Sequence, residues 1–143
     1  MSSITGANSV IMLSIPGLFP VPVQLQGFAA DDIFDTDAIE SAETLMGVDG
    51  KLSAGFVFVP VMQTFALQAD SPSTFFFDTW WASQQQVQDV YFANGVVLLT
   101  AVGKKWTMTK GALTSYKPIP DTKKVLQPQR HRITWQSVFP AVV

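Results

Sequence analysis

The sequence predicts a mainly β domain, a barrel-like pair of packed antiparallel sheets of about seven or eight strands. One flanking α-helix is expected near residues 73–88. Two observations support this fold class: short apolar or alternating runs recur along the chain, and turn pairs such as Pro16-Gly17 and Asp49-Gly50 separate them. A length of 143 residues suits one hydrophobic core, so residues 1–143 are treated as a single domain.

Two strands are expected in the N-terminal part. Residues 10–13 form a short apolar run that is stopped by Pro16-Gly17. Residues 23–26 alternate apolar and polar side chains with the period of a half-buried strand. Because Pro20 and Pro22 lead into this second run, and sheets tolerate proline mainly at their edges, we expect an edge strand.

A hairpin is expected in the next part of the chain. Residues 40–46 and 52–59 read as strands, and the Asp49-Gly50 pair between them favours a tight turn. The second strand is apolar on both faces from Phe56 to Val59. We therefore expect a core to cover one face and a helix or another subunit to cover the other.

A strand at residues 62–68 leads into the expected helix. Ser71 offers an N-cap, with Pro72 at the first helical position, and the helix then runs for about four turns. Its apolar side should cover the core. The residues expected on or beside that side are Phe76, Phe77, Trp80, Trp81 and Val87.

The remaining strands are expected in the C-terminal part. Residues 90–92 and 96–102 flank Asn94-Gly95, a pair that favours a hairpin turn. Residues 106–113 and 131–138 form the last two expected strands.

Charge is sorted along the chain. The net charge is −2, yet residues 1–50 hold seven acidic and no basic residues, while residues 104–143 hold eight basic residues and one acidic residue. Both groups could be solvated faces. Alternatively, they are patches that meet between copies of the chain, in a head-to-tail contact that produces rings or filaments. The candidate interface residues are Asp31, Asp32, Asp35, Asp37, Glu40 and Glu43 on the acidic side, and Lys104, Lys105, Lys110, Lys123, Lys124, Arg130 and Arg132 on the basic side.

The residue types argue against catalysis and metal binding. The chain has no cysteine, which excludes disulfides and thiolate ligands. His131 is the one histidine, and between Arg130 and Arg132 it reads as a surface strand residue. The acids at 31–37 lack the glycine and distal glutamate of a calcium loop. We expect no catalytic, cofactor-binding or metal-binding residues, and no enzyme.

Composition sets further limits. Hydrophobic residues make up 48% of the chain and charged residues 14%, the opposite of a disordered protein. The long uncharged stretch at 52–69 contains proline, serine and glutamine, so no membrane span is expected. The N-terminus lacks the features of a signal peptide, so we expect the chain to be made and kept in the cytoplasm. Residues 1–8 could form a flexible arm.

The aromatic residues suggest two alternative binding functions. The basic C-terminal part, with Trp106, Tyr116 and Trp135, could stack on nucleic acid, but the chain as a whole is acidic and has no nucleic-acid-binding signature. A β-sandwich carbohydrate-binding module is another alternative. Its stacking platform would come from Trp80, Trp81, Trp106 or Trp135.

Three segments, taken in order, carry a family resemblance. Residues 45–51 contain a Gly-x-Asp-Gly hairpin, residues 67–73 pass from a strand through a Ser-Pro pair to a helix, and residues 106–112 form a late strand. In this order, and in its length, the chain resembles phage tail tube proteins, in particular the small tube subunits of contractile-tailed phages. It is similar in the same way to type VI secretion and pyocin tube proteins.

The resemblance implies a structural virion protein. Its copies would form hexameric rings that stack helically into the hollow tail tube, through which phage DNA passes into the host without specific binding. Its partners would be other copies of itself and the tail sheath, baseplate or tube initiator, tape measure and tail terminator proteins. It would be assembled in the host cytoplasm and end in the tail of the virion. A ring-forming baseplate or tail-terminator protein of the same fold is the nearest alternative.

Overall fold

The computed structural model describes residues 9–29 and 33–142, and these residues form nine β-strands and one α-helix. The elements are β1 (Ser9–Ile15), β2 (Phe19–Gln24), β3 (Phe34–Thr36), β4 (Ala42–Met46), β5 (Leu52–Phe56), β6 (Val61–Leu67), α1 (Thr74–Val87), β7 (Ala93–Leu99), β8 (Lys104–Ser115) and β9 (Gln129–Val142). The predicted mainly β class with one helix is confirmed. The predicted N-terminal arm, residues 1–8, lies outside the described residues.

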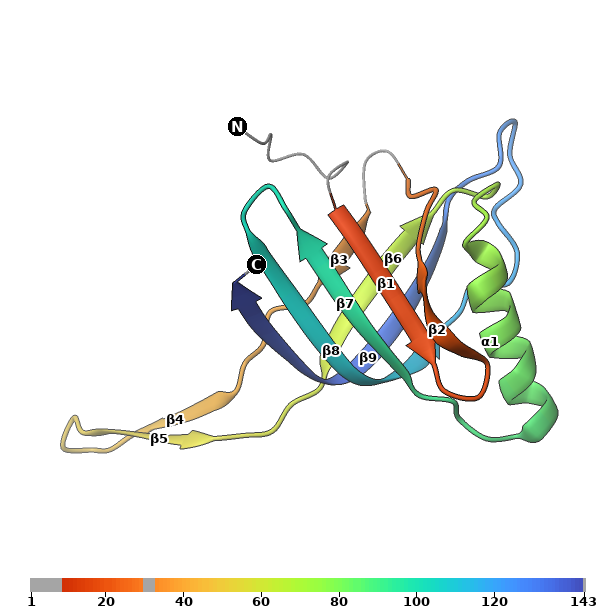
Figure 1. Ribbon diagram of the computed structural model, residues 1–143. Coiled ribbons are helices and arrows are strands. Elements are labelled where there is room, and N and C mark those ends of the chain that lie inside the picture. The colour runs from red at the N-terminus through yellow and green to blue at the C-terminus, as the bar shows by residue number, and fades with distance from the viewer. Residues whose placement is uncertain (1–8, 30–32, 143) are drawn as a thin grey trace.

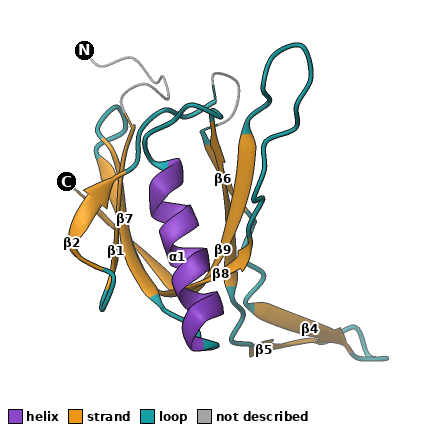
Figure 2. Cartoon of the chain, turned by 90° about the vertical axis from the view of Figure 1, so that its right-hand side faces the viewer, coloured by secondary structure: helices purple, strands orange, loops and turns teal. Residues whose placement is uncertain are grey.

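The strands form two antiparallel sheets, as predicted. Seven strands make one sheet in the order β2-β1-β7-β8-β9-β6-β3, and β4 pairs with β5 in the other. Figure 1 shows the large sheet curving over so that β3 and β6 lie behind β1 and β7. The helix α1 stands along the opening between the two halves of the curved sheet (Figure 2). The result is a barrel-like body with the helix on its flank.

The core fills the space between the sheet and the helix. Alternation along β1 buries Ile11, Leu13 and Ile15, because every second side chain points to the same face of a sheet. The helix contributes Phe76, Phe77 and Trp80, which are buried. Of the other two residues expected on this side of the helix, Trp81 is partly exposed and Val87 points to solvent.

The start of the helix differs from the sequence prediction. Ser73 precedes the first helical residue, Thr74, so Ser71 is not the N-cap and Pro72 is not the first helical residue. The Ser71 hydroxyl instead accepts a hydrogen bond from the backbone N–H of Ser73 (3.1 Å) and donates one to the carbonyl of Gln26. These bonds tie the start of the helix to the end of β2, and this tertiary contact takes the place of a local cap.

Most of the predicted strands are present, but several differ from the sequence prediction. Residues 90–92, expected as a strand, are not in one, and the strand expected at 52–59 ends at Phe56. Asn94 and Gly95 lie inside β7, not in a turn, because β7 is paired on both sides, with β1 and β8. Residues 34–36, where no strand was expected, form the short edge strand β3. The predicted cover of Phe56 is wrong within the subunit, since β5 contacts no core. The edge position predicted from Pro20 and Pro22 is confirmed, because β2 ends the sheet.

Candidate subunit interface

The β4–β5 hairpin projects from the body as an arm (Figure 1). Every residue from 42 to 56 is exposed, and the two strands pair with each other and not with the large sheet. Two-stranded hairpins are at best marginally stable alone in water. The arm is therefore a candidate surface for contact with another protein or with another copy of the chain.

The two faces of the arm differ in chemistry. The register pairs Met46 with Leu52 and Ala42 with Phe56, and between them Thr44 faces Ala54. Because paired residues and those two positions along share a face, these six side chains form one apolar face. The other face carries Glu43, Leu45, Ser53 and Gly55. We call the first set the apolar face of the arm.

The tip of the arm is well formed. The backbone N–H of Gly47 donates to the carbonyl of Lys51 (2.8 Å), and Asp49 Oδ1 accepts a hydrogen bond from the N–H of Lys51 (3.1 Å). Gly50 has a φ of +83°, a left-handed conformation that glycine adopts without strain. The turn predicted from Asp49-Gly50 is confirmed, and it holds the arm in a preformed shape.

The acidic candidate residues lead into this arm. Asp35 and Asp37 lie in and after β3, Glu40 precedes β4, and Glu43 lies on β4, and all four are exposed. Asp31 and Asp32 lie outside the described residues.

The basic candidate residues are spread over three places. Lys104 and Lys105 begin β8, and Lys123 and Lys124 are exposed in the loop between β8 and β9. That loop and the arm lie at opposite ends of the molecule in both views (Figure 2). The third place is on the strands themselves, where Lys110 Nζ lies 5.0 Å from the ring of Phe92, and Arg130 and Arg132 lie on β9.

One acidic and one basic candidate lie on either side of the same residue within a single subunit. Thr64 on β6 is the register partner of Asp35 on β3 and of Arg132 on β9. Arg132 Nε donates a hydrogen bond to the Thr64 hydroxyl at 3.4 Å. Asp35 and Arg132 therefore flank Thr64 on the same face of three neighbouring strands, and both are exposed.

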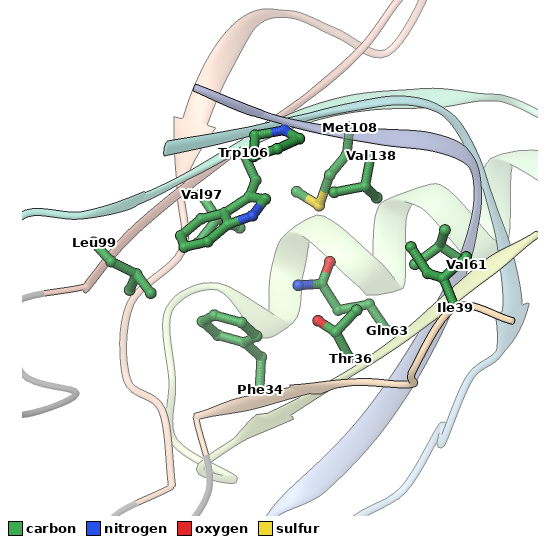
Figure 3. A pocket seen from close by; sticks show the side chains of 11 residues that line it. Phe34, Thr36, Ile39, Val61, Gln63, Val97, Leu99, Trp106, Met108 and Val138 are labelled. Carbon is green, nitrogen blue, oxygen red and sulfur yellow. The ribbon is translucent and has the colours of Figure 1, made fainter. Parts of the chain in front are cut away.

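An apolar cavity of about 480 Å³ opens in the curved body away from the helix. Figure 3 shows two facing walls. The wall from β7, β8 and β9 consists of Val97, Leu99, Trp106, Met108, Val138 and Pro140. The wall on the side of β3 and β6 consists of Phe34, Thr36, Ile39, Val61 and Gln63. Lys104 and Lys105 precede Trp106 on β8; Lys104 pairs with Leu99 of the cavity wall, whereas Lys105 lies on the opposite face of the strand.

His131 is buried, so the prediction of a surface residue is wrong. Its ring stacks on Phe77 of the helix at 4.5 Å and on Tyr116 at 5.2 Å. Burial lowers the pKa of His131 to about 4 and outweighs the opposite effect of the nearby carboxylate of Asp78. Its Nδ1 accepts a hydrogen bond from the N–H of Lys117 (3.4 Å), while Nε2 has no partner among the residues that the structure describes. The imidazole is neutral and serves to pack the helix on the sheet.

Tyr116 extends this stack. Its hydroxyl donates a hydrogen bond to Asp78, and its ring stacks on Trp81 at 5.2 Å. Burial and the hydrogen bond to Asp78 raise the pKa of Tyr116. The cluster joins α1 to the end of β8 and has the character of a structural contact.

The tryptophans offer little to a carbohydrate. Trp80 and Trp135 are fully buried, and Trp135 Nε1 donates a hydrogen bond to Gln63 Oε1 (3.0 Å). Trp106 faces the cavity, and Trp81 is already stacked on Tyr116. Trp80 and Trp135 are therefore excluded as stacking platforms of a carbohydrate-binding module.

The described residues contain no cluster of three or more histidine, aspartate or glutamate side chains that could hold a metal ion. In the same part of the chain, no helix is long and apolar enough to cross a membrane.

A comparison with known protein families identifies the class of protein to which this chain belongs. The family described as tail fiber protein gp32 matches residues 2–139. The chain belongs to this gp32 family. No curated protein sequence matches the chain. Membership of a tail-protein family confirms that this gp32-family chain is a structural tail protein and not an enzyme.

Solved structures share its fold. A chain of the anti-feeding prophage cap, called the AFP tube terminating cap, is 11% identical with a TM-score of 0.63, over 100% of this chain and 93% of that one. A chain of the anti-feeding prophage baseplate is 12% identical with a TM-score of 0.58, over 100% and 99%. A chain of the sheath-tube complex of PVC, an extracellular contractile injection system, is 13% identical with a TM-score of 0.55, over 93% and 88%. The gp32-family chain thus has a tail-tube-like fold, and the resemblance found in the sequence is confirmed.

Proposed function

We propose that this gp32-family chain is a tail tube subunit whose copies form hexameric rings, and that these rings stack into the hollow tube through which phage DNA passes into the host. The observation that carries the proposal is the exposed arm with its apolar face. A monomer would leave Met46, Leu52 and Phe56 in water, where exposed apolar patches usually mark a binding surface.

The placement of charge supports assembly from copies of one chain. Acidic side chains lead into the arm, and the lysines of the β8–β9 loop lie at the opposite end of the molecule (Figure 1). A contact between two different surfaces of identical subunits is heterologous, and such contacts close into rings or continue as helical filaments. We propose that the acidic and basic candidate residues meet in this way between copies.

The same proposal gives the chain its partners and its place. The tube would contact the sheath, the baseplate or tube initiator, the tape measure and the tail terminator. It would be assembled in the host cytoplasm and lie in the virion tail. The lumen would carry DNA without specific binding, because strong binding to phosphates requires clustered lysine or arginine.

The second candidate function is that of a protein with the same fold whose copies form a single ring. The cap and baseplate chains share this fold as well as the tube complex does, with TM-scores of 0.63 and 0.58 against 0.55. Negative-stain electron microscopy of the purified protein separates the candidates. Stacked tubes support the tube subunit, isolated rings support the cap or baseplate role, and globules that never associate contradict both.

A further inference from the structure

A buried amide group points into the cavity. Gln63 on β6 is 2% exposed, and its Oε1 accepts the hydrogen bond from Trp135 Nε1 (3.0 Å). Because only the oxygen of an amide can accept, this bond fixes the orientation of the group, and the nitrogen faces the space between Phe34 and Trp106 (Figure 3). Nε2 donates no hydrogen bond to any other described residue. Buried donors require an acceptor, and here the acceptor must come from within the cavity.

The cavity has the size and composition of a small-molecule site. Its volume of about 480 Å³ lies within the range of about 300–1,000 Å³ that is typical of ligand pockets. A dry cavity of about 150 Å³ holds one benzene ring, so this one has room for a molecule of about two rings. All of its lining side chains are apolar except Thr36 and Gln63, which are register partners on β3 and β6. Apolar walls with a few polar groups that orient the ligand are the usual design of such sites.

The walls of the cavity disfavour a charged ligand. None of its lining residues, all of which belong to the described part of the chain, is charged. Lys104 pairs with Leu99, but it is exposed and is not part of the lining. An ionised group in the cavity would lose its hydration without gaining a partner of opposite charge, which is costly. A neutral carbonyl oxygen needs only the donor that Gln63 Nε2 offers.

A segment of another polypeptide suits the cavity less well than a small molecule. Each residue of a peptide, proline apart, carries a backbone N–H and a C=O group, and both must be paired when they are buried. The side chains of the cavity offer only Gln63 and Thr36 as polar partners. A small molecule with a single acceptor has no further polar group that must be paired.

We propose that this cavity binds a neutral, largely apolar small molecule of about two rings, with one carbonyl group that accepts a hydrogen bond from Gln63 Nε2. The site goes beyond the proposed function and does not depend on it, because one subunit supplies every lining residue. Three probes separate the parts of the proposal. Benzophenone has two rings joined by a carbonyl group, diphenylmethane has the same shape without the acceptor, and 4-benzoylbenzoate adds a negative charge.

Isothermal titration calorimetry of the full chain with these probes tests the site. We expect benzophenone to bind at least as tightly as diphenylmethane, because a carbonyl group without a donor would weaken binding by about tenfold or more. 4-Benzoylbenzoate should bind at least about tenfold more weakly than benzophenone. Leu99→Trp adds bulk to the cavity wall and should weaken benzophenone binding at least about tenfold. The matched control is Leu98→Trp, on the opposite face of β7, which should bind benzophenone as the unchanged chain does.

Each result decides one part of the proposal. No binding of benzophenone, or equal loss in Leu98→Trp and Leu99→Trp, would overturn the site. Diphenylmethane bound about tenfold more tightly than benzophenone would overturn the role of Gln63, and equal binding of 4-benzoylbenzoate would overturn a neutral ligand. These probe comparisons use the unchanged chain, so they hold even where Leu99→Trp fails to fold. Benzophenone binding that is lost when subunits assemble into rings or tubes would overturn a small-molecule occupant in favour of a part of another copy.

Discussion

Met46 and Leu52 face each other as the last cross-strand pair of the β4–β5 hairpin, and their side chains are 62% and 57% exposed on the same face. They lie next to the turn, at the part of the arm farthest from the body (Figure 1). Neither residue belongs to the hydrophobic core formed by residues 9–29 and 33–142. Their position makes the end of the arm the best place to separate assembly from folding.

Leu52→Gln should impair assembly without unfolding the subunit. Burial of a leucine side chain is worth about 1.5–3 kcal/mol, so the concentration needed for assembly should rise about tenfold or more. The melting temperature of the monomer should not change, because Leu52 is exposed there. Light scattering as a function of protein concentration measures the first quantity.

Leu45→Gln is the matched control, since Leu45 is 75% exposed on the other face of the arm. It should shift the assembly concentration much less than Leu52→Gln. If the two variants behave alike, the arm uses both faces or neither, and the assignment of the apolar face is wrong.

Exchange of charge tests which basic residues meet the arm. Glu43→Lys should raise the assembly concentration by about twofold to fivefold, the range of an exposed ion pair worth about 0.2–1 kcal/mol. Lys123→Glu in the same chain should restore assembly, and Lys105→Glu should not. The effect should shrink in 1 M NaCl, where the screening length is about 3 Å. Rescue by Lys105→Glu in place of Lys123→Glu would assign the contact to the start of β8.

Acid should loosen the helix from the sheet through His131. Its pKa is about 4 in the folded chain, below the ordinary value of 6.5, so the unfolded chain binds more protons between these values and folding weakens as the pH falls. Between pH 7 and pH 5 this group should cost about 2 kcal/mol of unfolding free energy. Urea unfolding measures this cost, and His131→Phe, which keeps a ring between Phe77 and Tyr116, should remove most of it. An unchanged pH dependence in that variant would show that other groups cause it.

Gly111 tests the packing of the core. A Cβ atom at this position would lie 2.5 Å from the ring of the buried Trp135, which cannot move aside. Gly111→Ala should therefore lower the unfolding free energy by about 1–3 kcal/mol. Gly55→Ala, on the arm, meets nothing within 4 Å and should change it by less than about 0.5 kcal/mol. Chemical denaturation of both variants provides the comparison.

The fold was largely predictable because its strands have local signals. Residues 10–13 and 62–68 are apolar runs between turn residues, and the helix begins where the period changes. The hairpin turn predicted at Asn94-Gly95 is absent because tertiary packing decides the conformation there. Gly95 lies in a paired strand where an added Cβ would touch Leu13 and Trp135. Glycine is needed there for close packing and not for a turn.

The candidate site was predictable only in outline. The segregation of charge indicated contacts between copies, but a linear sequence does not show that Asp35 and Arg132 share a sheet face through Thr64. The cavity joins residues from five strands and was invisible for the same reason. His131 was misplaced because its neighbours in sequence are arginines, whereas its neighbours in space are Phe77 and Tyr116.

Removal of the arm tests the assembly role of this chain most directly. The N–H of Val57 donates to the carbonyl of Ser41 at 2.8 Å, so an Asn-Gly turn can join these positions in place of residues 42–56. Electron microscopy of the full chain should show rings or tubes, and the armless variant should stay monomeric with an unchanged melting temperature. Rings or tubes formed equally well by the armless variant, or a full chain that never associates, would contradict the role given to the arm.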